Sequence, residues 1–252
     1  MGSPVKTDFR RMRKSKLFYI LLASALLIPI VMTVMLTMMD GSVSVNPQTG
    51  EETIMKGPEF VWESIGTLSG AAGGMDVLAM CNINMMFMLV AVFVCLFICD
   101  DFRSGFAKNL FTVHAKKGGY VLSKTLAGFV CGGLMIVFYF IGSLLGGAIT
   151  GLSFQLGELS VFNIVMCILA KILLMLVFVP IFVTISVAAK QKAWLAICGS
   201  LGGGMLLFMM VPMITPLAST PIHLLLCFAG GVMFAASLGA ASKTILNRTR
   251  LV

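Results

Sequence analysis

Six long apolar runs constrain this 252-residue sequence more than any other feature. A helix needs about 20 apolar residues to cross the hydrocarbon core of a bilayer, and each run is long enough. The chain is 59% hydrophobic and 11% charged, a balance that cannot cover the surface of a water-soluble protein. We therefore expect one all-α membrane domain over residues 1–252. Its six transmembrane helices are predicted at about 17–39, 77–99, 125–149, 161–189, 193–214 and 222–241.

The basic residues predict how these spans are oriented. Six Lys and Arg precede the first span, five lie in 100–124, two separate the fourth and fifth spans, and three follow the sixth. The other connecting segments carry seven acidic residues and one lysine, Lys56. Because cytoplasmic loops are rich in Lys and Arg, we expect both termini and 100–124 in the cytoplasm, with 40–76 outside. The net charge of +8 then reflects orientation and attraction to anionic lipid, with no need of a nucleic acid.

The segment 100–124 mixes charge with apolar side chains at helical spacing. Four of the apolar residues are separated by four, four and three positions, which places them on one face of a helix. These residues are Phe102, Phe106, Leu110 and Val113. The pattern predicts a short amphipathic helix at the cytoplasmic surface, with Phe106 and Leu110 as anchors for a protein partner. Residues 1–16 are also basic, and we expect a second cytoplasmic amphipathic segment there.

Lys171 is the one basic residue inside an apolar run. As a helix, the run 161–189 would be about 43 Å long, which exceeds the hydrocarbon core. In one interpretation 161–170 lies along the outer interface and Lys171 reaches water at the rim. In the other the helix tilts and Lys171 faces an internal cavity, as a residue of a translocation pathway. We favour the rim, and the sequence leaves both open.

Pairs of glycines four residues apart recur within the predicted spans. This G-x-x-x-G spacing lets two helix backbones approach closely in lipid. We expect the pairs to serve packing within the bundle or between protomers. They are Gly128 and Gly132, Gly142 and Gly146, and Gly199 and Gly203.

Sequence patterns of catalysis and cofactor binding are missing. The stretch 239–244 ends in Lys-Thr but lacks the glycine before the lysine that a phosphate-binding loop requires. The seven cysteines lie in or beside apolar runs, where a thiol behaves as a small hydrophobe, so we expect no metal site. Acidic residues are absent from the spans as well. We therefore expect a chain that is not an enzyme by itself, binds no cofactor, and draws energy for any uphill transport from a partner.

The arrangement resembles the membrane subunit of a bacterial ABC-2 type ABC exporter, and is similar to bacteriocin-immunity and peptide-toxin export permeases. A basic amphipathic N-terminus, six spans, a large loop after the first span and DDFRSGFAKNL…GGYVLSK after the second carry the resemblance. The matching residues are Asp101, Phe102, Gly105, Lys108, Asn109, Tyr120, Ser123 and Lys124.

The resemblance implies a complex in the bacterial cytoplasmic membrane, made of two copies of this chain and two copies of a separate ATPase that binds ATP and Mg²⁺. The segment after the second span would be a coupling helix that the ATPase receives. Its coupling residues would be Asp101, Phe102, Arg103, Gly105, Phe106, Lys108, Asn109 and Leu110. The exported compound would pass between the two protomers.

Two functions from different classes remain. The first is an ATP-driven exporter subunit for amphipathic or antimicrobial peptides, or for similar hydrophobic compounds. The second is a non-transporting membrane protein, an immunity or sensor-scaffold subunit whose cytoplasmic helix docks a partner.

Overall fold

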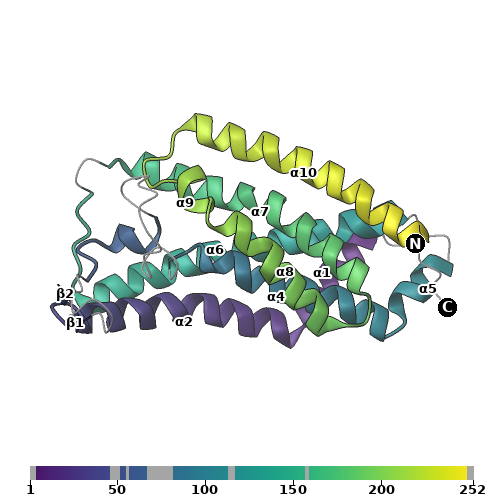
Figure 1. Cartoon of the computed structure of the whole chain (residues 1–252), viewed down its shortest axis with the longest axis horizontal. Coiled ribbons are helices and arrows are strands. Elements are labelled where there is room, and N and C mark those ends of the chain that lie inside the picture. The colour runs from purple at the N-terminus through teal and green to yellow at the C-terminus, as the bar shows by residue number, and fades with distance from the viewer. Residues whose placement is uncertain are drawn as a thin grey trace.

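The computed structural model describes residues 4–45, 52–54, 57–66, 82–112, 117–156 and 159–248, and these form an elongated helical bundle (Figure 1). Its long helices are α2 (Lys16–Met38), α4 (Met85–Arg103), α6 (Lys117–Thr150), α7 (Val161–Ala189) and α10 (Pro221–Arg248). Its shorter elements are α1 (Pro4–Lys14), the antiparallel strands β1 (Val43–Val45) and β2 (Glu52–Ile54), the 3₁₀ helix η1 (Val61–Ser64), α5 (Phe106–Thr112), α8 (Ala193–Phe208) and α9 (Val211–Ile214).

Among the described residues, five helices are long and apolar enough to cross a membrane: α2, α4, α6, α7 and α10. The expected fifth span at 193–214 is not one continuous helix. It is divided into α8, of 16 residues, and the single turn α9, with Met209 and Met210 between them. Sixteen residues extend about 24 Å, less than the roughly 30 Å of a hydrocarbon core. Gly202, Gly203, Gly204 and Pro212 weaken the helix on both sides of this break.

Two helices differ from the apolar runs that predicted them. α4 begins at Met85 and continues to Arg103, four residues past the predicted end of its span, while 77–81 lies outside the described residues. α6 begins at Lys117, eight residues before the run at 125–149. Both extensions place charged residues inside the bundle. This is possible because these charges are paired there, as described below. α7 occupies the same residues as the fourth apolar run.

The expected helix through 100–113 is interrupted. Gly105 adopts φ +73°, a left-handed conformation that suits glycine and ends α4. Phe102 therefore belongs to α4, whereas Phe106 and Leu110 belong to α5. The prediction that they share the face of one helix is wrong, and Val113 lies outside the described residues.

The basic segments gather at one end of the bundle. α1, α5, the turn between α7 and α8 and the last turns of α10 lie there, while the β1–β2 hairpin, η1 and α9 lie at the other end (Figure 1). This grouping is the one that the distribution of Lys and Arg predicts for a cytoplasmic and an outer side. α1 turns Asp8 and Met12 inward and leaves an exposed groove of about 670 Å³ lined by Lys6, Arg10, Arg13 and Lys14 with Val5, Phe9 and Tyr19.

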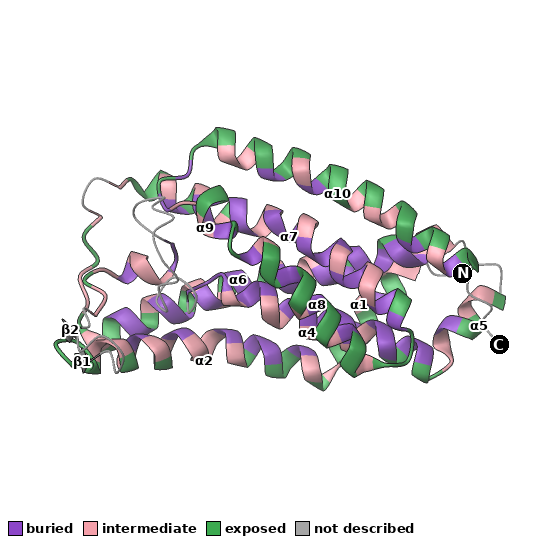
Figure 2. Ribbon diagram, viewed as in Figure 1, coloured by how far each residue is buried: buried purple, intermediate pink, exposed green. Residues whose placement is uncertain are grey.

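The core lies between α4, α6 and α7, whose facing residues are buried (Figure 2). α10 packs against α7 and leaves most of its own surface exposed (Figure 2). All three predicted glycine pairs lie at helix contacts in this bundle, Gly199 and Gly203 against Ile185 of α7. A Cβ on Gly128 or Gly132 would meet Val179 or Met175 of α7, and one on Gly142 or Gly146 would meet α2.

Replacing Gly142 by alanine should destabilise the bundle. A Cβ there would lie 2.6 Å from Pro29 Cγ and would also overlap the Leu26 carbonyl, and neither a ring nor a helix backbone can move aside easily. Overpacking of this kind costs about 1–3 kcal/mol, which exceeds the helix-propensity gain of about 1 kcal/mol. Thermal unfolding in detergent measures the effect. Gly202→Ala is the control, because a Cβ at Gly202 meets nothing within 4 Å. Equal melting temperatures for the two variants would contradict close α2–α6 packing.

Candidate functional site

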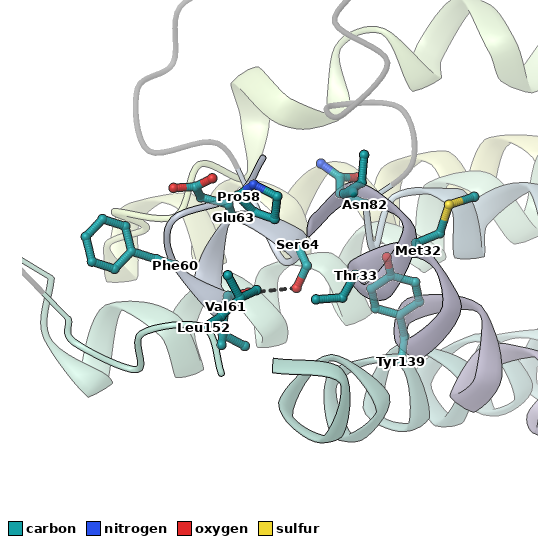
Figure 3. Close-up of a pocket in the computed structure, with 11 residues that line it drawn as sticks. Met32, Thr33, Pro58, Phe60, Val61, Glu63, Ser64, Asn82, Tyr139 and Leu152 are labelled. Atoms are coloured by element: carbon teal, nitrogen blue, oxygen red, sulfur yellow. Dashed lines mark hydrogen bonds between the residues drawn. The ribbon is translucent and has the colours of Figure 1, made fainter. Parts of the chain in front are cut away.

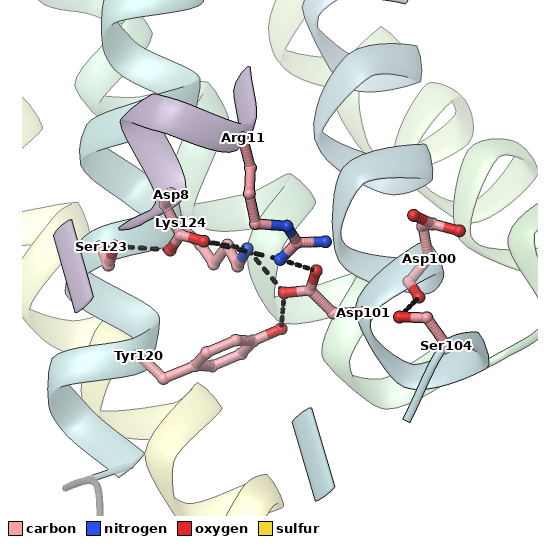
Figure 4. A network of polar contacts seen from close by, with 8 residues as sticks. All are labelled: Asp8, Arg11, Asp100, Asp101, Ser104, Tyr120, Ser123 and Lys124. Atoms are coloured by element: carbon pink, nitrogen blue, oxygen red, sulfur yellow. Dashed lines mark hydrogen bonds and ion pairs between the residues drawn. The ribbon is translucent and has the colours of Figure 1, made fainter. Parts of the chain in front are cut away.

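Four charged side chains meet inside the basic end of the bundle (Figure 4). Asp101, in the last turn of α4, accepts from Arg11 Nη1 at 2.6 Å and from Lys124 Nζ at 2.6 Å. Lys124, in the first part of α6, also contacts Asp8 Oδ1 at 2.8 Å. Asp8 and Arg11 both belong to α1. We call these four residues the charge cluster; it joins three helices and its formal charges sum to zero.

Neutral and aromatic groups complete the charge cluster. Tyr120 donates its hydroxyl to Asp101 Oδ2 at 3.1 Å, and Ser123 donates to Asp8 Oδ2 at 2.6 Å (Figure 4). The ammonium of Lys124 lies 4.0 Å from the centre of the Phe97 ring, and the Arg11 guanidinium lies 4.2 Å from that of Phe106. Such cation–π contacts stabilise a cation that has lost its water. The side chains of Asp101 and Lys124 are fully buried.

Burial determines how much these ion pairs contribute to stability. Removing two charges from water costs about as much as their attraction returns, so a buried pair adds little net stability. Removing one partner, however, leaves a buried charge uncompensated. The charge cluster therefore specifies one arrangement of α1 on α4 and α6, because other arrangements leave charges unpaired. The charge cluster thereby fixes the end of α4, and so the point at which the chain continues into Gly105 and α5.

The predicted coupling residues divide into an inner and an outer group. Asp101 and Phe102 are buried in the bundle, so their side chains are not accessible to a protein partner. Phe106 and Leu110 are half-buried; Phe106 lies under Arg11, and Leu110 packs against the core. Arg103, Lys108 and Asn109 are exposed. Gly105 forms the turn between the two groups.

Sequence reasoning did not find Asp8 and Arg11 as members of this cluster. The available signal was an acid in a strongly basic segment, three residues before Arg11 and so on the same helix face. On α6, Ser123 and Lys124 lie three and four residues after Tyr120, and so on the same helix face. These three residues were part of the resemblance, but without an assigned role.

Lys171 is the second buried polar centre, and the interpretation that places it at the rim is wrong. α7 is one continuous helix from Val161, so 161–170 does not lie separately along the interface. The Lys171 side chain is fully buried. Its Nζ donates to Asn84 Oδ1 at 2.7 Å and to Thr215 Oγ1 at 3.0 Å. It thus lies between the N-terminus of α4 and the residue that ends α9.

A small cavity of about 20 Å³ lies near the end of the bundle that carries the β1–β2 hairpin, between α2, η1 and α6 (Figure 3). Its polar lining comes from Thr33, Glu63, Ser64, Asn82 and Tyr139. Burial raises the pKa of the Glu63 carboxyl above its ordinary value. The volume suffices for about one water molecule, so this cavity is not a passage for an organic compound.

Among the described residues, no three His, Cys, Asp or Glu side chains are grouped in a way that could hold a metal ion. Cys95 instead donates to Ser200 Oγ at 3.1 Å, which links α4 to α8.

The fold defines a multi-pass helical membrane protein with a buried charge cluster at its basic end. A family profile described as ABC-2 family transporter protein matches residues 5–206, most of the chain, and the chain belongs to this family. The family forms the membrane part of transporters and partners with ABC ATPases, so a permease role follows. The match includes α1, α4, α5 and the start of α6, and therefore the whole charge cluster. Comparison with curated proteins and with solved structures gave no match.

Asp101→Asn should strongly destabilise the protein, because Lys124 and Arg11 would then share Asp8 alone. Breaking a buried pair costs about 3–5 kcal/mol, which corresponds to a loss of about 6 °C or more in melting temperature for a chain of this size. Thermal unfolding of the purified protein provides the measurement.

Asp100→Asn is the matched control. Asp100 is the preceding residue, is exposed and points away from the charge cluster (Figure 4), so its loss should change stability by about 0.5 kcal/mol or less. Asp101→Asn combined with Lys124→Met should recover part of the loss, since it removes a charge of each sign. A melting temperature for Asp101→Asn equal to that of Asp100→Asn would show that the charge cluster does not determine stability.

Proposed function

We propose that this chain is the permease subunit of an ATP-driven exporter and that a separate ABC ATPase docks on α5. The observation that carries the proposal is the attachment of α5 to the charge cluster. α5 follows Asp101 by five residues, and its Phe106 ring lies under the Arg11 guanidinium of the cluster. A force applied to α5 would therefore reach α1, α4 and α6 together.

The docking surface is polar. Arg103, Lys108, Asn109 and Thr112 are exposed, while Ala107 is buried and Phe106, Leu110 and Phe111 are turned partly inward. Phe111 packs edge-on against Tyr120, with ring centres 5.3 Å apart. The hydrophobic residues hold α5 to the bundle, and the exposed ones are free to meet the ATPase. The two cations among these four residues favour an acidic groove on the ATPase, because complementary charge steers and orients association.

The proposed complex holds two copies of the chain. Exposed apolar side chains cover much of α2, α8 and α10, and such surfaces face lipid or another protomer. With the ATPase on α5, the exported compound would move between the two copies toward the end that carries the β1–β2 hairpin. Our proposed substrates are amphipathic or antimicrobial peptides, or similar hydrophobic compounds. This choice rests on the resemblance to peptide-toxin exporters and on the apolar composition of the spans.

Arg103→Glu combined with Lys108→Glu should release the ATPase. Reversing both cations on the docking surface would place like charges against the acidic groove, and we expect binding to fall at least about tenfold, or about 1.4 kcal/mol. The complex is purified from native membranes through a tag on the permease, and the ATPase that accompanies it is quantified. Lys243→Glu, which reverses an exposed cation on α10, is the control and should retain the ATPase.

The same purified complex separates export from a scaffold role. In proteoliposomes, an exporter should hydrolyse ATP faster when a cationic amphipathic peptide is added and should move that peptide across the bilayer.

For the docking experiment, a wild-type yield of ATPase with the double reversal would contradict docking on α5. An ATPase that binds but never responds to peptide would favour the immunity or sensor-scaffold function.

A further inference from the structure

Among the described residues, only neutral groups donate to or accept from the amine of Lys171. An ammonium has three N–H donors, and its two contacts here are the amide oxygen of Asn84 and the hydroxyl of Thr215. Among the described residues, no carboxylate lies within salt-bridge distance of Lys171. A buried charge without a counter-charge is costly, whereas the charge cluster at the other end of the bundle is neutral. Within the part of the chain that the structure describes, a charged Lys171 therefore has no counter-charge.

Two amide donors at the N-terminus of α4 have no acceptor among the described residues. Asn84 presents its Oδ1 to the ammonium, so the orientation of its amide is fixed, and its Nδ2 is buried without a hydrogen-bond partner. The Nδ2 of Asn82 is buried without a partner as well. Asn82 is held beside Asn84 by accepting the backbone N–H of Asn84 at 2.9 Å. An unsatisfied buried amide costs about 1–3 kcal/mol, and two of them at one helix N-terminus, one of which contacts a lysine, point to a missing acceptor.

The backbone adds to this field. Asn84 is the residue that caps the N-terminus of α4, where the helix dipole favours negative charge. An ammonium and two amide N–H₂ groups are all donors, and the dipole adds to their positive field. Their shared complement is an anion that accepts several hydrogen bonds and fits a dry, closely packed space.

We propose that Lys171, Asn84 and Asn82 bind one small monovalent anion, a halide or the carboxylate of a small molecule, at the N-terminus of α4. The anion neutralises the Lys171 ammonium and accepts from both amides. Only a small ion suits the site, because Lys171, Asn84 and Asn82 are all buried and closely packed. The proposal requires neither the ATPase nor transport, so its outcome is independent of the proposed export function.

The test is thermal unfolding of the purified permease alone in detergent. Sodium chloride replaces sodium isethionate, whose bulky anion cannot enter the site, at constant ionic strength. Raising chloride from about 5 to about 200 mM should raise the melting temperature by about 4 °C or more if the site has millimolar affinity. A second series with sodium formate distinguishes the two sources of the anion. Stabilisation by chloride alone assigns a halide site, and stabilisation by formate assigns a carboxylate site.

Three variants test the assignment to these residues. Lys171→Met removes the charge and should abolish the anion dependence. Asn84→Asp places a carboxylate on the same side-chain geometry, 2.7 Å from the ammonium in the wild type, and should give a folded protein that no longer responds to anions. Lys243→Met removes an exposed cation and should respond like the wild type.

A wild-type melting temperature that is independent of both anions would overturn the proposal, as expected if Lys171 is neutral or if a carboxylate of this chain occupies the site. An equal response in Lys171→Met would overturn it too, because it would mark a general salt effect. If Lys171→Met fails to fold, Asn84→Asp decides the matter. An unchanged anion response in Asn84→Asp would contradict the site.

Discussion

The pairing of Asp101 with Lys124 is the interaction on which the rest of this structure depends. It draws the C-terminal turn of α4 and the N-terminal turns of α6 together, and Asp8 and Arg11 add α1 to the same point. Asp8, Asp101 and Lys124 are buried and Arg11 is partly exposed, so detaching α1 would leave the buried Asp101 and Lys124 without two of their partners. The position of α5, which follows directly, is a consequence of this arrangement.

The membrane class, the long helices and the grouping of basic segments could be predicted from the sequence, because hydrophobic length and the distribution of Lys and Arg are local properties. The charge cluster could not be predicted, since Asp8 and Asp101 lie 93 residues apart in the chain and no period connects them. Lys171 shows the same limit. Its run length suggested a residue at the rim, whereas Asn84 and Thr215 bury it. The break at Gly105 was obscured by apolar spacing that continues across it.

Two polar centres therefore occupy opposite ends of one apolar bundle. The neutral charge cluster lies at the basic end, and the unpaired Lys171 lies near the end with the hairpin and η1. Their electrostatic roles differ. A cluster with balanced charges resists rearrangement, whereas a lysine surrounded by neutral oxygens responds to whatever negative charge approaches it. The bundle is thus held in one arrangement at the end where we propose the ATPase binds. At the other end, the environment of Lys171 can respond to an approaching negative charge.

α4 connects the two centres, with Asn84 at its first turn and Asp101 at its last, about 25 Å apart along the axis. Between them the helix contains neither proline nor glycine, unlike α2, α6 and α7, so it has no built-in hinge. A rod of this kind transmits an axial push without absorbing it. If the ATPase displaces Asp101 by a fraction of a helical turn, Asn84 must shift against Lys171 by the same amount. α4 would then act as a piston that couples nucleotide-driven movement on one side of the membrane to the polarity of a site near the other.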